Sequence, residues 1–180
     1  KKSYKIIANY YTKKTKKNFK ILNILKPTIN PKVTTNVTYI IKTIIILFEK
    51  NYAYINPMGD VYHNIKKNTT YGILSNRITN NVTTFKKDFV LWKKMKQNEP
   101  NWKSPFGNGR PGWHIECTAI SKKYIGSVID IHGGGIDLIF PHHDNELEQF
   151  KNLTKASKIN YWVHVGMVQK NKQKLSKTKK

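Results

Sequence analysis

The sequence holds only one cysteine in 180 residues, Cys117, which excludes an internal disulfide framework. Long apolar runs are absent as well, since the longest candidate spans residues 44–48, far short of the roughly 18 residues that cross a bilayer. The N-terminus has no apolar stretch beside a small-residue cleavage site, so no secretory signal is indicated. We therefore expect a monomeric cytoplasmic protein with no membrane partner.

Acidic residues and arginine are also scarce. Ten Asp and Glu stand against 33 Lys and Arg, which gives a formal net charge of +23, and only two of the basic residues are arginine. Such a charge attracts polyanions with an affinity that falls steeply in salt. Lys, Ile and Asn supply 72 of the 180 residues, and all three have A/T-rich codons, so codon bias explains the basicity equally well. The charge permits an RNA partner without establishing one.

The polar chemistry gathers in one stretch of the chain. Seven of the ten glycines lie between residues 107 and 135, which indicates tight turns and a backbone that closely approaches a ligand or another segment. Residues 111–150 hold the cysteine, six of the ten acidic residues and four of the six histidines, namely Glu116, Asp130, Asp137, Asp144, Glu146, Glu148, His114, His132, His142 and His143. We therefore look for the functional site in this stretch.

Apolar periodicity and turn residues predict the elements of the first part. We expect a lysine-rich helix over residues 4–24 and a second helix over 36–50, although its β-branched composition leaves a strand open. Residues 52–55 and 61–65 flank a Pro/Gly loop and predict a hairpin, and residues 89–92 predict a strand.

The later part predicts alternating helices and strands. After a Gly/Pro loop over 105–112 we expect a helix over 113–123, a strand over 127–131 and a glycine turn over 133–135. A helix follows from Pro141 to about residue 155, and a strand over 162–168. Strand, glycine turn and helix in this order predict an α/β sheet, whose ligands usually lie at the carboxyl ends of its strands.

A possible metal site follows from residue spacing. His142 and Glu146 are four residues apart on the expected helix, so both side chains can reach one ion, and Cys117 adds a soft sulfur ligand from the preceding helix. Sulfur, nitrogen and oxygen ligands together suit zinc. The competing interpretation makes Cys117 a small buried hydrophobe and the histidines satisfied core groups. Three ligands are one short of a closed structural site.

A basic and hydroxyl cluster spans residues 174–178, KLSKT. Lys174 and Lys177 lie three residues apart and could neutralise charge that develops on a transferring triphosphate. In a chain with 31 lysines, a solvated tail is the competing interpretation. The glycine run 133–135 matches neither a Walker loop nor GxGxxG, so by itself it carries little information.

Taken together, three runs closely resemble cysteinyl-tRNA synthetases, with the resemblance extending over about residues 20–180. They are GRPGWHIEC at 109–117, DIHGGGIDLIFPHHDNE at 130–146 and KLSKT at 174–178. The resemblance implies an α/β fold in which residues 96–180 form the second half of a Rossmann-type class I synthetase catalytic domain, ending in a KMSKS-like loop. Residues 1–95 would then form part of a preceding mixed α+β connective insertion with helices and a hairpin.

The resemblance also implies roles for individual residues. Cys117, His142 and Glu146 fall on three of the family's zinc ligands, and Trp113 and His132 fall where side chains wall the amino-acid pocket. Lys177 falls on the ATP-binding lysine of the KMSKS loop, where Leu175 and Thr178 replace Met and Ser. The remaining expected contacts to the nucleotide are Gly133, Gly134, Gly135, Asp137 and Lys174.

The expected substrates are L-cysteine, ATP with Mg²⁺, and tRNA(Cys), with one zinc ion per chain. The family's first catalytic half, with its HIGH-type motif and the cysteine that is the fourth zinc ligand, has no counterpart in these 180 residues. We therefore expect a central piece of the enzyme that is inactive alone and takes its fourth ligand from a preceding segment. Two alternatives stay open: a related ligase that joins cysteine to an amino sugar, and a non-catalytic basic RNA-binding remnant.

Overall fold

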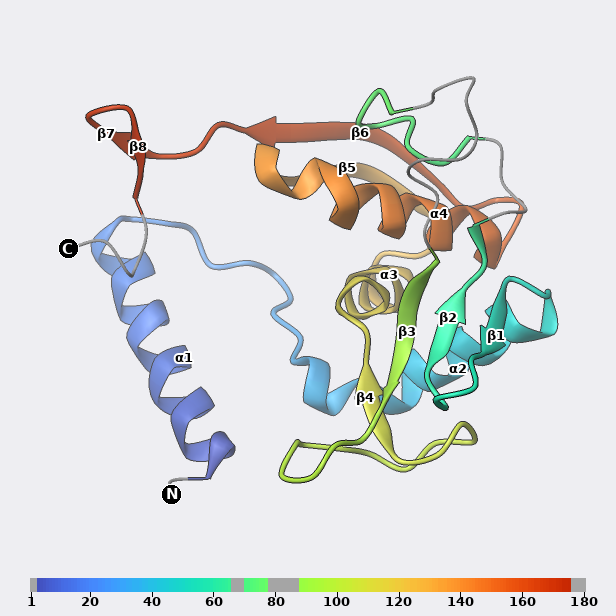
Figure 1. Ribbon diagram of the computed structural model, residues 1–180. Helices are drawn as coiled ribbons and strands as arrows, with labels where there is room; N and C mark the ends of the chain where they lie inside the picture. Colours follow the sequence, from blue (N-terminus) through green and yellow to red (C-terminus); the bar gives the residue numbers. More distant parts are fainter. Residues whose placement is uncertain (1–2, 66–69, 78–87, 176–180) are drawn as a thin grey trace. The chain divides into compact units, whose positions relative to one another are not determined.

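The computed structural model describes residues 3–65, 70–77 and 88–175 (Figure 1). The chain divides into two compact units, residues 1–31 and residues 32–180. Within the described ranges, no helix combines the length and the apolarity that a bilayer crossing requires.

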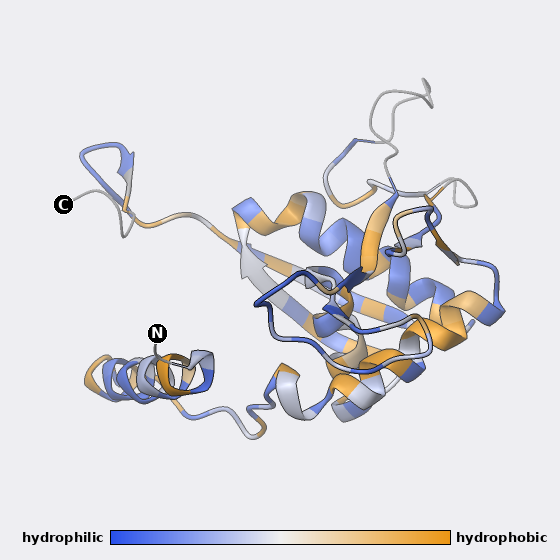
Figure 2. Ribbon diagram, turned by 60° about the horizontal axis from the view of Figure 1, so that its bottom comes forward, coloured by the Kyte–Doolittle hydropathy of each residue, from blue (hydrophilic) through white to orange (hydrophobic). Residues whose placement is uncertain are grey.

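Residues 1–31 are built around one helix, α1 (Tyr4–Ile21), close to the expected range. The Ser3 side chain accepts a hydrogen bond from the Lys5 backbone N–H and so caps its N-terminus. No residue of α1 is buried, and hydrophilic and hydrophobic residues both occur along it (Figure 2). Residues 1–31 carry nine lysines and no acidic residue, so this unit contributes much of the net charge.

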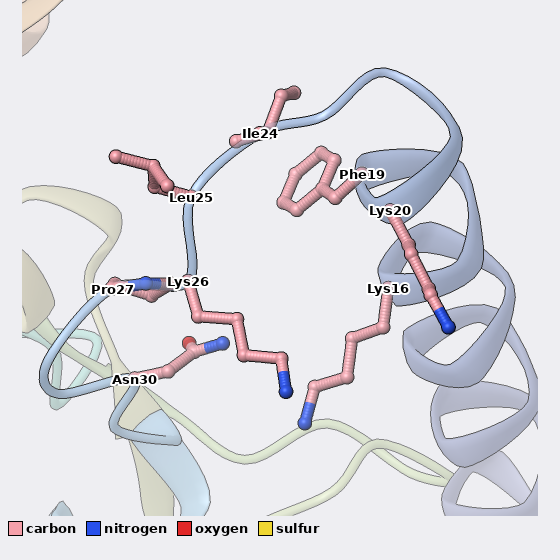
Figure 3. A pocket seen from close by; sticks show the side chains of 8 residues that line it. All are labelled: Lys16, Phe19, Lys20, Ile24, Leu25, Lys26, Pro27 and Asn30. Carbon is pink, nitrogen blue, oxygen red and sulfur yellow. The ribbon is translucent and has the colours of Figure 1, made fainter.

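A cavity of about 340 Å³ lies within residues 1–31. The Phe19 ring faces the hollow, and the side chains of Lys16 on α1 and Lys26 on the following segment point toward one another (Figure 3). Its complete lining is Lys16, Phe19, Lys20, Ile24, Leu25, Lys26, Pro27 and Asn30. None of the residues that the sequence singles out for chemistry belongs to this cavity.

The second unit begins with a 3-10 turn, η1 (Val33–Thr35), and the helix α2 (Val37–Glu49). The segment forms the expected helix and not the strand that its β-branched composition left open. The buried positions Val37, Ile40, Ile44 and Leu47 follow a spacing of three or four residues and place one apolar stripe in the core. α2, α3 and α4 pack against one another, so one hydrophobic core joins segments from Val37 to Leu153.

Four antiparallel strands form a sheet beside these helices in the order β1 (Ala53–Ile55), β2 (Val61–His63), β3 (Phe89–Lys94) and β4 (Gly109–Pro111). The expected hairpin and the strand from residue 89 are confirmed. The loop expected over 105–112 is wrong at 109–111, because this segment pairs with β3. A Cβ on Gly112 would collide with the Val90 carbonyl oxygen, so glycine is what permits the close approach.

A parallel pair of strands, β5 (Val128–Gly135) and β6 (Lys158–Val165), carries the α/β character. The glycine turn expected over 133–135 is wrong: these three glycines are the end of β5 and pair with residues 163–165 of β6. The strand expected over 162–168 in fact begins four residues earlier. Strand pairing over a separation of thirty residues outweighed the low strand propensity of glycine.

The helices complete the unit. α3 (Trp113–Tyr124) follows β4 directly, close to the expected range. The helix expected from Pro141 begins later: the short turns η3 (Ile136–Leu138) and η4 (Ile139–His143) precede α4 (Asp144–Leu153). Phe140 has extended, non-helical dihedral angles, so the backbone breaks immediately before Pro141. The short strands β7 (Gln169–Lys170) and β8 (Gln173–Lys174) end the described chain.

His63 joins the antiparallel sheet to α4 and makes stability depend on pH. It is fully buried, its ring stacks on Phe89 at 5.0 Å, and Asn152 lies 3.4 Å from Nε2. Burial lowers the pKa of His63 from 6.5 to about 4. Below the unfolded pKa the unfolded chain therefore binds a proton that the folded chain excludes, and folding loses about 1.4 kcal/mol per pH unit until the folded pKa is reached.

We expect His63→Phe to lower the number of protons taken up on unfolding by about one. Urea unfolding at pH values between about 7 and about 5 measures it, because the slope of the unfolding free energy against pH reports proton uptake. The wild-type slope keeps contributions from the other buried histidines, so the difference between the two proteins is the relevant quantity. Equal slopes in both would contradict the assignment.

Candidate metal centre

Three elements of the second unit bring Cys117, His142 and Glu146 together. Cys117 lies on α3, His142 on η4 and Glu146 in the first turn of α4. Their ligand atoms, one sulfur, one ring nitrogen and one carboxylate oxygen, all lie within 4.8 Å of one another. His142 and Glu146 are almost completely buried, and Cys117 is partly buried. These are the three residues that spacing singled out.

The packing of α3 on α4 sets the distance between Cys117 and Glu146. Thr118, next to the cysteine, donates a hydrogen bond of 2.6 Å to the side-chain oxygen of Gln149 on α4. The other end of α4 is held by residues 70–77, where the Leu74 N–H donates to Asp144 and the Tyr71 hydroxyl donates to Asn145. Both ends of the helix segment that carries Glu146 are thus anchored.

The carboxylate of Glu146 makes two close approaches to histidine. Its Oε1 lies 2.6 Å from His142 Nε2, and its Oε2 lies 3.2 Å from His132 Nε2. Apart from this ion-pair contact with His142, Oε1 is buried and has no hydrogen-bond partner. A buried carboxylate oxygen without a hydrogen bond, beside a ring nitrogen and a sulfur within 4.8 Å, is a donor set that suits zinc, so the residues present fit a metal ion.

A second layer orients His142. His114 Nδ1 lies 2.8 Å from His142 Nδ1, and this contact directs Nε2 of His142 toward Glu146. Burial and the neighbouring His142 lower the pKa of His114 to about 4, so His114 is neutral at physiological pH. The Trp113 ring stacks on His142 with a centroid distance of 4.2 Å and is itself 57% exposed. Trp113 therefore lies between the cluster and solvent.

The surroundings of Cys117 favour its protonated thiol. Burial, followed by the negative charges of Glu146 and Glu116, raises its pKa to about 12. The thiol therefore stays protonated at neutral pH in the protein alone. A divalent cation at this point would reverse that preference, because a metal-bound thiol is deprotonated.

His132 lies in the later half of β5, next to residues of β6 to which the sequence assigned no role, Trp162 and His164. His132 on β5 contacts the Trp162 ring at 4.5 Å, and His143 Nδ1 lies 2.7 Å from His164 Nε2 on β6. The signal that could have found Trp162 and His164 is their alternate spacing on a strand, opposite His132 and Gly134. That signal is visible only once the strand register is known.

Four of the residues expected to contact the nucleotide lie next to one another in the described chain. Gly133, Gly134 and Gly135 end β5, and Asp137 folds against Gly135, where a Cβ would meet its carboxylate at 2.5 Å. Lys174 is placed in β8 by its backbone alone. Lys177 lies outside the described residues.

Comparison with known proteins gives a consistent result. The family model of the class I (C) tRNA synthetase catalytic domain matches residues 1–180. The cysteine–tRNA ligase of Wigglesworthia glossinidia brevipalpis is 47% identical over 191 residues, covering 99% of this chain and 41% of the relative. That of Methanococcus vannielii is 46% identical over 185 residues, covering 97% and 39%, and that of Blochmanniella floridana is 48% identical over 172 residues, covering 88% and 36%.

The chain thus spans about two fifths of the length of the curated relatives it matches. Mixed α/β content, the parallel pair β5–β6 and the match over the whole chain agree with one another. The chain belongs to the class I tRNA synthetases, within the family of catalytic domains that includes the cysteine–tRNA ligases.

Proposed function

We propose that this chain is part of the catalytic domain of a cysteine–tRNA ligase and that Cys117, His142 and Glu146 hold a zinc ion that selects the amino acid. The observation that carries the proposal is the convergence of a sulfur, a nitrogen and an oxygen ligand within 4.8 Å, with Glu146 Oε1 buried and without a hydrogen bond. The names of the relatives support the substrate assignment, L-cysteine and tRNA(Cys).

Residues 96–180 would supply the second half of a Rossmann-type domain, preceded by a connective insertion over 1–95. The parallel strands β5 and β6 are connected in sequence through α4, which supports this arrangement, since strand–helix–strand units build such sheets. A fourth zinc ligand would come from the part of the protein beyond this chain, and catalysis would need that longer protein. We expect a cytoplasmic monomer.

The chemical reason for a metal is that serine differs from cysteine by one atom. A pocket that relies on packing separates such pairs by only about 1–3 kcal/mol. A bound zinc ion would take the substrate thiolate as a ligand, a bond that a neutral hydroxyl does not match. His114 holds His142 in the ligating orientation, Trp113 covers the cluster, and His132 forms a wall beside Glu146.

The chain's lysines would act on the nucleotide. In the proposed reaction the carboxylate of L-cysteine attacks the α-phosphate of Mg²⁺-bound ATP, which gives cysteinyl adenylate and releases pyrophosphate. A hydroxyl at the 3′ end of tRNA(Cys) then attacks the carbonyl carbon of the adenylate, forms the ester and releases AMP. Lys174 and Lys177 would offset the charge on the departing pyrophosphate. Nine lysines and no acidic residue in 1–31 suit a polyanionic partner such as tRNA.

The decisive experiment compares substrates in ATP–pyrophosphate exchange by the full-length protein. We expect kcat/KM for L-cysteine to exceed that for L-serine by more than about 1,000-fold, because packing alone yields about 10- to 200-fold. L-alanine, which offers no ligand atom, serves as the control and is expected to match L-serine. Discrimination within the packing range would contradict selection by a metal, and activation of cysteine without tRNA charging but with transfer to an amino sugar would favour the related ligases.

A further inference from the structure

The two oxygens of Glu146 face two different groups of ligands. Oε1 faces His142, in the group that includes Cys117, whereas Oε2 lies 3.2 Å from Nε2 of His132. His132, His143 and Glu146 form a group of their own, with ligand atoms within 4.8 Å of one another. Two nitrogens and one oxygen therefore surround a point on the opposite side of the same carboxylate.

His143 is oriented for such a role. Its Nδ1 is engaged with His164 Nε2 at 2.7 Å, which leaves Nε2 as the nitrogen available for a ligand. A ligating histidine commonly has its other nitrogen held in this way, because the contact sets the tautomer and the ring orientation. Gly134 makes room for the ring: a Cβ there would lie 2.8 Å from His143 Nε2. The end of β5 thus shapes space for this nitrogen.

We propose that His132, His143 and Glu146 form a second position for a divalent transition-metal cation, alternative to the position at Cys117, His142 and Glu146. The inference rests on the proposed function in one respect only, that Glu146 is shared by both positions. Two imidazoles and a carboxylate bind Zn²⁺ and Co²⁺ without a thiolate. Both positions use the Glu146 carboxylate, and we assign them as alternatives for a single ion.

The distances are compatible with a bound ion after small movements. Zinc–nitrogen and zinc–oxygen bonds are about 2.0–2.2 Å, so the ligand atoms of a tetrahedral ion lie about 3.4 Å apart. His132 and Glu146 already meet that separation, at 3.2 Å. The His143 ligand atom lies within 4.8 Å of the other two, so a small movement of its side chain brings it to bonding distance. The consequence is that oxidation or alkylation of Cys117 relocates the ion without releasing it.

Titration with Co²⁺ alone distinguishes the two positions, because a thiolate ligand gives a sulfur-to-cobalt charge-transfer band and histidine does not. In the full-length protein the wild type is expected to bind one Co²⁺ with this band. Cys117→Ser should still bind one Co²⁺, with visible d–d bands and no charge-transfer band. A weaker band that persists in this variant would show that the ion stays at the first position on the cysteine expected from the preceding segment, and it would contradict relocation. His143→Asn, which keeps a polar group near Nδ1 and deletes Nε2, should retain the band.

The double variant Cys117→Ser/His143→Asn should bind Co²⁺ at least 10-fold more weakly than Cys117→Ser. Cys117→Ser/His132→Asn provides a second test of the same group, and Cys117→Ser/His63→Asn, which loses a buried histidine outside both groups, is the matched control with unchanged affinity. Circular dichroism confirms that each variant is folded. A Cys117→Ser protein that binds no Co²⁺, or double variants that bind as tightly as it does, would overturn the second position.

These outcomes are separable from those for the proposed function. If the wild type binds Co²⁺ without a charge-transfer band, the thiolate position fails, while the dependence on His143 and His132 still decides the second position. If the wild type shows the band and Cys117→Ser binds nothing, the thiolate position stands and the second one is rejected.

Discussion

Replacement of Cys117 by serine is expected to lower cysteine-dependent ATP–pyrophosphate exchange of the full-length protein by at least about 100-fold, since even outer partners of a metal site contribute about 10- to 100-fold. Zinc affinity falls as well, because a hydroxyl replaces the only sulfur ligand in the chain. Exchange at saturating cysteine and metal content after dialysis measure the two effects. Any metal retained by the variant would lack the ligand that positions the substrate thiolate.

The control is removal and return of the metal. Chelation should inactivate the wild type, and added zinc should restore it, whereas added zinc should leave the serine variant inactive. The physical reason is the environment of the thiol, whose pKa of about 12 reflects burial and the carboxylates of Glu146 and Glu116. A thiol in those surroundings ionises only against a cation. Exchange that persists unchanged in a metal-free variant would rule out the thiolate mechanism.

Replacement of Lys177 by alanine is expected to slow formation of the adenylate by about 100- to 1,000-fold, the loss typical of one group that stabilises transition-state charge. Binding of L-cysteine should stay nearly intact, because the proposed role of this lysine is toward the triphosphate. Pre-steady-state adenylate formation measures the first quantity, and equilibrium binding of L-cysteine measures the second.

The matched control is Lys180→Ala, three residues further along the same lysine-rich end of the chain. It removes the same charge outside the KLSKT motif and should leave both quantities unchanged. Equal losses of cysteine binding and adenylate formation in Lys177→Ala would indicate a structural lysine. Equal effects of the two substitutions would indicate that only the total charge matters.

Elements whose signal is local were predictable. The sequence of α2 has apolar residues at spacings of three and four, and Pro57 and Gly59 indicate the turn of the β1–β2 hairpin. The elements that were missed owe their conformation to partners distant in sequence. β4 holds one glycine and one proline, and β5 ends in three glycines, residues that disfavour strands by themselves. Both segments become strands because each pairs with a neighbouring strand.

In the candidate metal site, too, local features could be predicted and features that depend on distant segments could not. His142 and Glu146 lie four residues apart, so their proximity follows from a single helical turn. The sequence by itself also determined the family, through the runs around Cys117, His132 and His142. It could not determine the wider surroundings of Glu146, because His132 on β5 and His164 on β6 are brought there by the folded parallel strands, His132 against Glu146 and His164 against His143.

Tertiary structure alone decided that Cys117 meets Glu146, through the packing of α3 on α4, and that Glu146 presents one oxygen to each of two ligand groups. The reason is that spacing along a chain specifies neighbours only within a helix turn or along a strand. Distances between elements are set by core packing and strand register, which are properties of the folded chain.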